Sequence, residues 1–141
     1  MNHKFTMAMV FGVFDMFHPG HLSFLRQSRE VAKNLVVVVA RDSVVKQLKK
    51  GKPHFSERVR VAHLKKEFKD GVTVVLGDRK LGAYSVIKRY KPDCICLGYD
   101  QRVLATDLKT HMRQKHIPRA RLIRLRAYKP HRYHTSLFQH S

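Results

Sequence analysis

Two histidines three residues apart are the clearest candidates for chemistry in this sequence. His18 and His21 flank Pro19 and Gly20, directly before a segment with leucine and phenylalanine at helical intervals. The first turn of a helix has backbone N–H groups without partners and the positive end of the helix dipole, so it favours an anion. Pro19 suits a first turn, and Gly20 leaves space for a ligand near the backbone. The spacing therefore predicts a phosphate site to which both imidazoles donate hydrogen bonds.

The histidines close a longer pattern, Gly-x-Phe-Asp-x-x-His-x-Gly-His, at residues 12–21. This signature loop resembles that of the cytidylyltransferase-like branch of the nucleotidyltransferase superfamily, whose members join an NTP to a phosphorylated small molecule and release pyrophosphate. The resemblance implies that His18 and His21 are catalytic. It also implies a loop that binds the nucleotide, in which Asp15 orients the loop or accompanies magnesium. The other loop residues assigned to nucleotide binding are Gly12, Val13, Phe14 and Gly20.

Length and composition predict one domain over residues 1–141. The chain is 43% hydrophobic, enough for a core and against disorder. No apolar stretch approaches the roughly 20 residues that cross a bilayer, and the amino-terminal segment lacks a signal-peptide cleavage site. We therefore expect a cytoplasmic protein that does not bind membranes.

Strand-like and helix-like segments alternate about five times along the chain. The β-branched run at 34–40 has no polar interruption, as in a parallel strand covered on both faces. The alternation predicts a doubly wound, Rossmann-like α/β domain with a five-stranded parallel sheet. Strands are expected at 7–11, 34–40, 72–76, 93–97 and 121–125, and helices at 22–33, 43–50, 56–68, 83–90 and 103–115.

Two cysteines, Cys94 and Cys96, lie one residue apart within the fourth expected strand. We expect the strand to point them to opposite faces, which would suit no disulfide. Buried core thiols are favoured over a metal or redox site.

Ligands of such sheets bind beyond the carboxyl ends of the strands. Polar residues follow every expected strand except the third. In the resembling families a lysine of the loop after the second strand neutralises the pyrophosphate leaving group. Lys49 is the preferred match and Lys46 the second, with a solvated loop as the alternative. Arg58 matches an arginine that the resembling families have at the start of the next helix. A surface ion pair is an equally compatible role for Arg58. The further residues assigned to nucleotide binding are Gly98, Asp100, Gln101, Arg126, Thr135 and Ser136.

The segments at 40–46, 52–53 and 97–101 resemble those of the archaeal-type FAD synthase family. Its members are stand-alone FMN adenylyltransferases. Heptose-phosphate adenylyltransferases share parts of this resemblance. It implies ATP and FMN as substrates, with Mg²⁺ delivered by the NTP. The alternative is a CTP-using glycerol-3-phosphate cytidylyltransferase. Only Thr135-Ser136 survives of the Arg-Thr-Glu-Gly-Ile-Ser-Thr motif of those enzymes, within an atypical basic segment at 126–141.

The net charge of +19 attracts polyanions, and no acidic residue follows Asp107. A hypothesis of another class is therefore a basic nucleic-acid-binding protein on a retired nucleotidyltransferase fold. His131, His134 and His140 lack the spacing of a zinc motif, so no resident metal is expected. Dimers are common in the resembling families, so a homodimer is one expected assembly.

Overall fold

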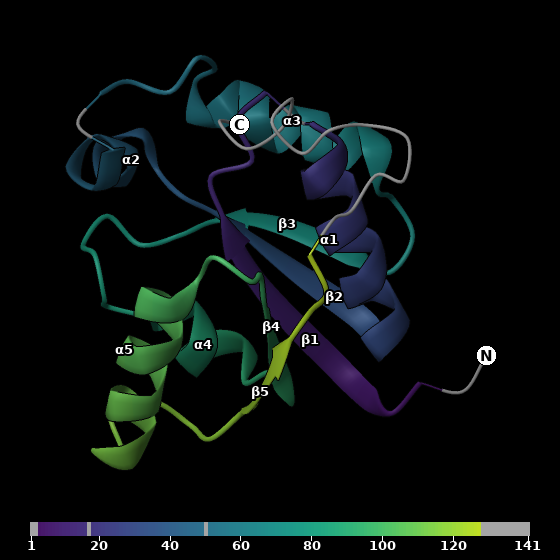
Figure 1. Cartoon of the computed structure of the whole chain (residues 1–141), viewed down its shortest axis with the longest axis vertical. Helices are drawn as coiled ribbons and strands as arrows, with labels where there is room; N and C mark the ends of the chain where they lie inside the picture. Colours follow the sequence, from purple (N-terminus) through teal and green to yellow (C-terminus); the bar gives the residue numbers. More distant parts are fainter. Residues whose placement is uncertain (1–2, 17, 50, 128–141) are drawn as a thin grey trace.

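A parallel β-sheet forms the centre of the molecule, and its strands have the order β3-β2-β1-β4-β5 (Figure 1). The computed structural model describes residues 3–16, 18–49 and 51–127. The described strands are β1 (Phe5–Gly12), β2 (Ala32–Val39), β3 (Val72–Leu76), β4 (Cys94–Leu97) and β5 (Arg121–Arg124). The predicted five-stranded parallel sheet is thereby confirmed.

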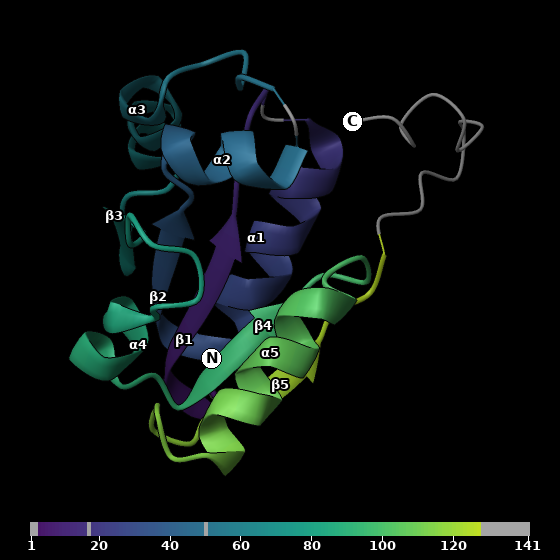
Figure 2. The same cartoon turned by 90° about the vertical axis from the view of Figure 1, so that its left-hand side faces the viewer.

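Helices connect successive strands and cover both faces of the sheet (Figure 2). Leu25 and Leu64 belong to the core on one face, and Ile87 and Leu108 belong to the core on the other. The central β2 run is buried on both sides, as its uninterrupted β-branched sequence predicts. The described helices are α1 (Pro19–Val31), α2 (Asp42–Lys49), α3 (Glu57–Glu67), α4 (Ser85–Tyr90) and α5 (Arg102–Arg113).

The first helix is shorter than expected at its end. It was expected to continue to residue 33, but it stops at Val31 because Ala32 already pairs with Phe5 of β1. Ala32 is buried and is itself the first residue of β2, so the chain passes directly from helix into strand. Pro19 lies in the first turn, as predicted, but the helix begins at this residue, ahead of the expected start at residue 22.

The two cysteines lie on the same face of β4, which corrects the expectation of opposite faces. Cys94 and Cys96 both belong to the core beneath α1 and α3, whereas Ile95 belongs to the core beneath α4 and α5. The reason is the two-residue period of a strand, which returns residues i and i+2 to one side. Both thiols are free and buried.

The order of the strands reverses between β1 and β4. The chain proceeds from β1 outward to β2 and β3, then crosses back to β4 on the other side of β1. Ligands of open α/β sheets bind beyond the carboxyl ends of the strands at such a reversal. β1 ends at Gly12, where the signature loop begins. In the described residues no helix is long and apolar enough to cross a membrane.

Candidate active site

The signature loop leaves β1 through a strained turn. Phe14 and Met16 have φ angles of 54° and 49°, in the left-handed region that costs side-chain-bearing residues on the order of 1 kcal/mol or more each. Phe14 is buried, and its ring lies 2.6 Å from where a Cβ on Gly12 would be. Gly12 is therefore needed to admit the Phe14 ring over the end of β1.

The buried Phe14 ring supports the histidines. It meets the His21 ring edge to face, with centroids 5.6 Å apart, and His21 in turn stacks on His18 at 3.8 Å. On its other side Phe14 stacks against Phe24 of α1 at 6.5 Å. The four rings form a row from the core to the loop, so Phe14 positions His21. Its sequence-based assignment was to nucleotide binding.

His18 caps the helix that it precedes. Its Nδ1 accepts a hydrogen bond of 3.0 Å from the Gly20 N–H, and its carbonyl oxygen accepts one from the His21 N–H. Because Nδ1 is an acceptor, the neutral imidazole carries its proton on Nε2. The N–H groups of Gly20 and His21, expected to be open to an anion, are thus bonded within the turn.

Gly20 has a related role. A Cβ at this position would lie 2.8 Å from Cε1 of His18, so the glycine makes room for the capping imidazole. The sequence analysis assigned this space to a ligand. An anion at this helix start would instead be held by imidazole donors and by the positive end of the α1 dipole.

Asp15 fastens the signature loop to the loop before α3. Its two carboxylate oxygens accept hydrogen bonds from the backbone N–H groups of His54 (2.7 Å) and Phe55 (3.0 Å). Partial burial alone would raise the pKa of Asp15, but these two bonds and the nearby charges of His54 and Arg60 lower it below its usual value. The contacts fit the orienting role among the two interpretations of Asp15.

A buried arginine, Arg60 of α3, lies beneath the site and is not exposed at all. Its Nε donates to the carbonyl oxygen of Phe55, and its Nη1 donates to those of Val13 and Ala40 at 2.8 Å each. Its Nη2 donates to Oδ1 of Asp42 at 2.6 Å. One guanidinium thus joins the ends of β1 and β2 to the starts of α2 and α3.

Sequence reasoning selected Arg58 and missed Arg60. Arg58 is exposed in the first turn of α3, away from these carbonyl groups. The signal that identifies Arg60 is spacing, because it precedes Leu64 by four residues and Phe68 by eight, and both are buried. Residues four apart share one face of a helix.

The end of β4 lies beside the end of β1. The Gln101 side chain accepts a hydrogen bond from the Gly98 N–H (2.9 Å) and donates one to the carbonyl oxygen of Phe11 (2.8 Å). Gln101 therefore clamps β4 to β1, where the sequence analysis assigned it to nucleotide binding. Asp100 is exposed, and a Cβ on Gly98 would lie 3.0 Å from its Oδ1.

The remaining predicted residues lie on other elements. Lys46 is exposed on α2. Lys49 is the last residue of α2, and its side chain lies outside the described part of the structure. Arg126 is joined to α1 by a pair of 3.0 Å backbone hydrogen bonds with the Gln27 side chain. Thr135 and Ser136, with most of the basic 126–141 segment, lie outside the described residues.

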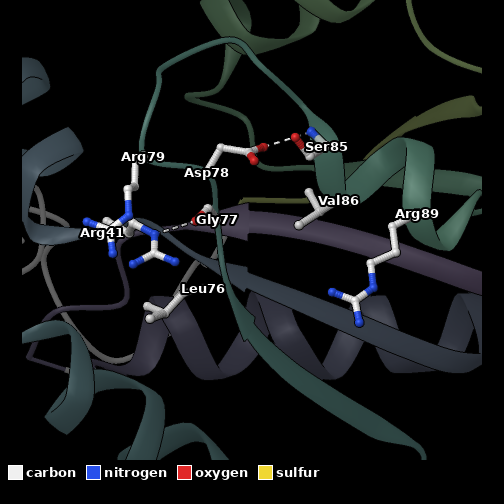
Figure 3. Close-up of a pocket in the computed structure, with 8 residues that line it drawn as sticks. All are labelled: Arg41, Leu76, Gly77, Asp78, Arg79, Ser85, Val86 and Arg89. Atoms are coloured by element: carbon white, nitrogen blue, oxygen red, sulfur yellow. Dashed lines mark hydrogen bonds between the residues drawn. The ribbon is translucent and has the colours of Figure 1, made fainter.

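The end of β3 carries polar groups that the sequence analysis did not expect there. Asp78 and Arg79 follow this strand, and Arg41 reaches it from the end of β2 (Figure 3). The Arg41 Nε donates a 2.7 Å hydrogen bond to the carbonyl oxygen of Gly77. Within the described ranges, no group of three His, Cys, Asp or Glu side chains is placed to hold a metal ion.

Replacing Arg60 with lysine is expected to lower the free energy of unfolding by about 2 kcal/mol or more. One ammonium group cannot reach acceptors spread around a planar guanidinium, and buried acceptors left unpaired are costly. Urea unfolding of Arg60→Lys measures the effect. Arg58→Lys in the same helix is the matched control and should stay within about 0.5 kcal/mol of wild type. Equal losses in both variants would contradict the assignment.

Asp15 is expected to make stability depend on acid pH. Its folded pKa lies below the ordinary value of 3.8, so its ionised form stabilises the fold above that pH and the contribution disappears as pH falls through the folded pKa. Between about pH 5 and about pH 2, wild type should lose more unfolding free energy than Asp15→Asn, which does not titrate. Parallel pH curves from chemical denaturation would show that Asp15 contributes nothing.

Comparison with known proteins agrees with this geometry. Residues 9–137 match the family model described as cytidylyltransferase-like. The FAD synthase of Aciduliprofundum boonei is 40% identical over 121 residues, which cover 86% of this chain and 78% of that protein. The FAD synthase of Thermoplasma acidophilum is 40% identical over 122 residues, with coverages of 86% and 82%.

A solved structure is also similar. The lipopolysaccharide core biosynthesis protein from Thermoplasma volcanium GSS1 superposes with a TM-score of 0.78 at 33% identity, and the match covers 89% of this chain and 99% of that one. The family match spans the signature loop and the described strand ends from β1 to β5. The chain belongs to the cytidylyltransferase-like family of nucleotidyltransferases.

Proposed function

We propose that this protein is an FMN adenylyltransferase, which transfers the AMP part of ATP to the phosphate of FMN and releases pyrophosphate. The observation that carries the proposal is the stacked His18–His21 pair at the beginning of α1, in a chain 40% identical to proteins named FAD synthase. The reversal of strand order between β1 and β4 supports it, because open α/β sheets bind nucleotides beyond the strand ends at such a point.

The reaction needs no covalent intermediate on the protein. An oxygen of the FMN phosphate attacks the α-phosphorus of ATP, forming the new P–O bond. The bond between the α-phosphorus and the bridging oxygen breaks, and pyrophosphate leaves with that electron pair. The phosphate is already a nucleophile, so the protein acts by holding both reactants in line and by stabilising charge.

The histidines supply the charge stabilisation in this proposal. The His18 Nε2–H and the His21 ring donate to the α-phosphate oxygens, where negative charge accumulates in the transition state. The α1 dipole adds a positive potential at the same place. The His21 ring is held by packing against Phe14, and the His18 ring stacks on His21, so little reorganisation is needed when the charge develops.

Cations on other elements would neutralise the leaving pyrophosphate. We assign this role to Lys49, with Lys46 as second choice. The nucleotide contacts that we keep are Arg58, Asp100, Arg126, Thr135 and Ser136. Mg²⁺ enters as part of the ATP substrate, because its ligands come largely from the phosphates. Asp15 is given the orienting role in this proposal, since both of its oxygens accept hydrogen bonds from the loop before α3.

The reaction itself is tested by pyrophosphate release from purified protein with Mg²⁺. ATP with FMN is expected to give sustained release, whereas CTP with glycerol 3-phosphate should give little. Each nucleotide alone is the control for hydrolysis. Release that requires CTP and glycerol 3-phosphate would favour the cytidylyltransferase alternative, and no release with ATP and FMN would refute the proposal.

The cap geometry selects the best variant for testing His18. Asparagine is a good N-cap, so His18→Asn keeps an acceptor for the Gly20 N–H but removes the Nε2 donor. We expect kcat to fall about 10²–10³-fold, as for loss of one transition-state hydrogen bond, with the thermal midpoint nearly unchanged. His21→Ala should lower kcat similarly. An unchanged kcat in His18→Asn would exclude this role for the imidazole.

A further inference from the structure

A hollow beside the ends of β2 and β3 is lined by three arginines (Figure 3). Arg41 comes from the end of β2, Arg79 follows β3, and Arg89 belongs to the last turn of α4. The volume is about 450 Å³, within the range of small-molecule sites. We call this hollow the arginine pocket. Its apolar wall includes Leu76 and Val86.

Two charged groups of the arginine pocket are already held in place. Arg41 donates through Nε to the carbonyl oxygen of Gly77, and its Nη1 lies 3.7 Å from Oε2 of Glu57. The Asp78 Oδ2 accepts a 2.7 Å hydrogen bond from the Ser85 N–H. A carboxylate has about four lone-pair sites, so Asp78 can accept from a ligand as well. The pocket thus offers a fixed acceptor among guanidinium donors.

Hydrogen bonds between the strand ends locate the pocket relative to the start of the signature loop. The Ala40 N–H donates to the carbonyl oxygen of Gly12, and the Gly77 N–H donates to that of Val39. The ends of β1, β2 and β3 therefore lie in one row, with neighbouring strands about 4.8 Å apart. The lining of the pocket begins at Arg41, one strand spacing from β1. It continues to Gly77 and Arg79, about two strand spacings or roughly 10 Å from the start of the signature loop at Gly12.

This arrangement matches the shape of FMN. A five-carbon ribityl chain separates its phosphate from its ring, so the two ends can occupy places about two strand spacings apart. The pyrimidine edge of the ring presents a carbonyl, an N–H and a second carbonyl. Arginines can donate to the carbonyls, and Asp78 can accept from the N–H between them. Guanidinium planes and the side chains of Leu76 and Val86 suit the flat, aromatic remainder.

We infer that the arginine pocket holds the flavin ring of the acceptor, while the FMN phosphate lies beside the ATP α-phosphate that His18 and His21 bind. This inference rests on the proposed function, since it places the second substrate of that reaction. A pocket of cations could alternatively take a phosphate group, and the experiment separates these two occupants by using a flavin without phosphate.

The test measures binding of FMN and of riboflavin by quenching of flavin fluorescence. Arg89→Ala should weaken both ligands by a similar factor, about tenfold for loss of one charge-assisted hydrogen bond. Arg79→Ala provides a second variant. The control is Arg113→Ala, because Arg113 is likewise an exposed arginine in the last turn of a helix but lies outside this pocket. It should bind both flavins like wild type.

Three results would overturn the inference. If both Arg79→Ala and Arg89→Ala bind riboflavin with wild-type affinity, the arginine pocket does not bind the flavin. Weaker FMN binding with unchanged riboflavin binding would assign the arginines to a phosphate. No riboflavin binding to the wild type would show that the ring itself is not recognised.

Turnover separates this inference from the proposed function. If wild type releases pyrophosphate from ATP and FMN while Arg89→Ala keeps the wild-type KM for FMN, only the pocket assignment fails. If wild type binds riboflavin through these arginines but gives no release, the proposed reaction fails and the pocket remains a flavin site.

Discussion

The buried Arg60 guanidinium is the interaction on which the candidate site depends. A charge without exposure to water is tolerated only where its donors are paired, and four of its five N–H donors have acceptors here. Three acceptors are backbone carbonyls from segments far apart in sequence. Such loops lack regular secondary structure to hold them, so the guanidinium supplies the common point that fixes the signature loop against β2 and α3.

The signature loop shows why a short motif can require so many fixed residue types. Gly12 gives space to Phe14, Phe14 packs against His21, and Gly20 gives space to the His18 cap. Each small residue thus serves a ring of the protein itself. The strain of two left-handed residues is held by the burial of Phe14 and by the bonds of Asp15. The motif encodes the preorganisation of two imidazoles, and this suits a reaction driven by electrostatic stabilisation.

The fold was predictable because its signals are local and repeated. β-branched runs predicted the strands, and helical spacing of apolar residues predicted the helices between them. The contacts that complete the site are not local. Arg60 was missed because a charged side chain is not expected at a buried helix position. Its spacing from Leu64 and Phe68 nevertheless places it on the inward face of the helix. The arginine pocket was missed for a similar reason, because Arg41 and Arg89 come together only once β2 and α4 are packed. The same-face placement of Cys94 and Cys96 follows from strand period alone and was within reach of the sequence.

The distribution of acids explains how a chain of net charge +19 keeps an ordered substrate-binding edge. Carboxylates are few, and several of them accept hydrogen bonds from backbone N–H groups, from an arginine or from a tyrosine. These are Asp15, Asp42, Glu57, Asp78, Asp93 and Asp107. Their charge is used within the fold, at short range. The excess of lysine and arginine then contributes a long-range positive field, which favours encounter with triphosphates and phosphorylated acceptors. Selection between such anions therefore depends on the short-range groups, because the overall field attracts them all.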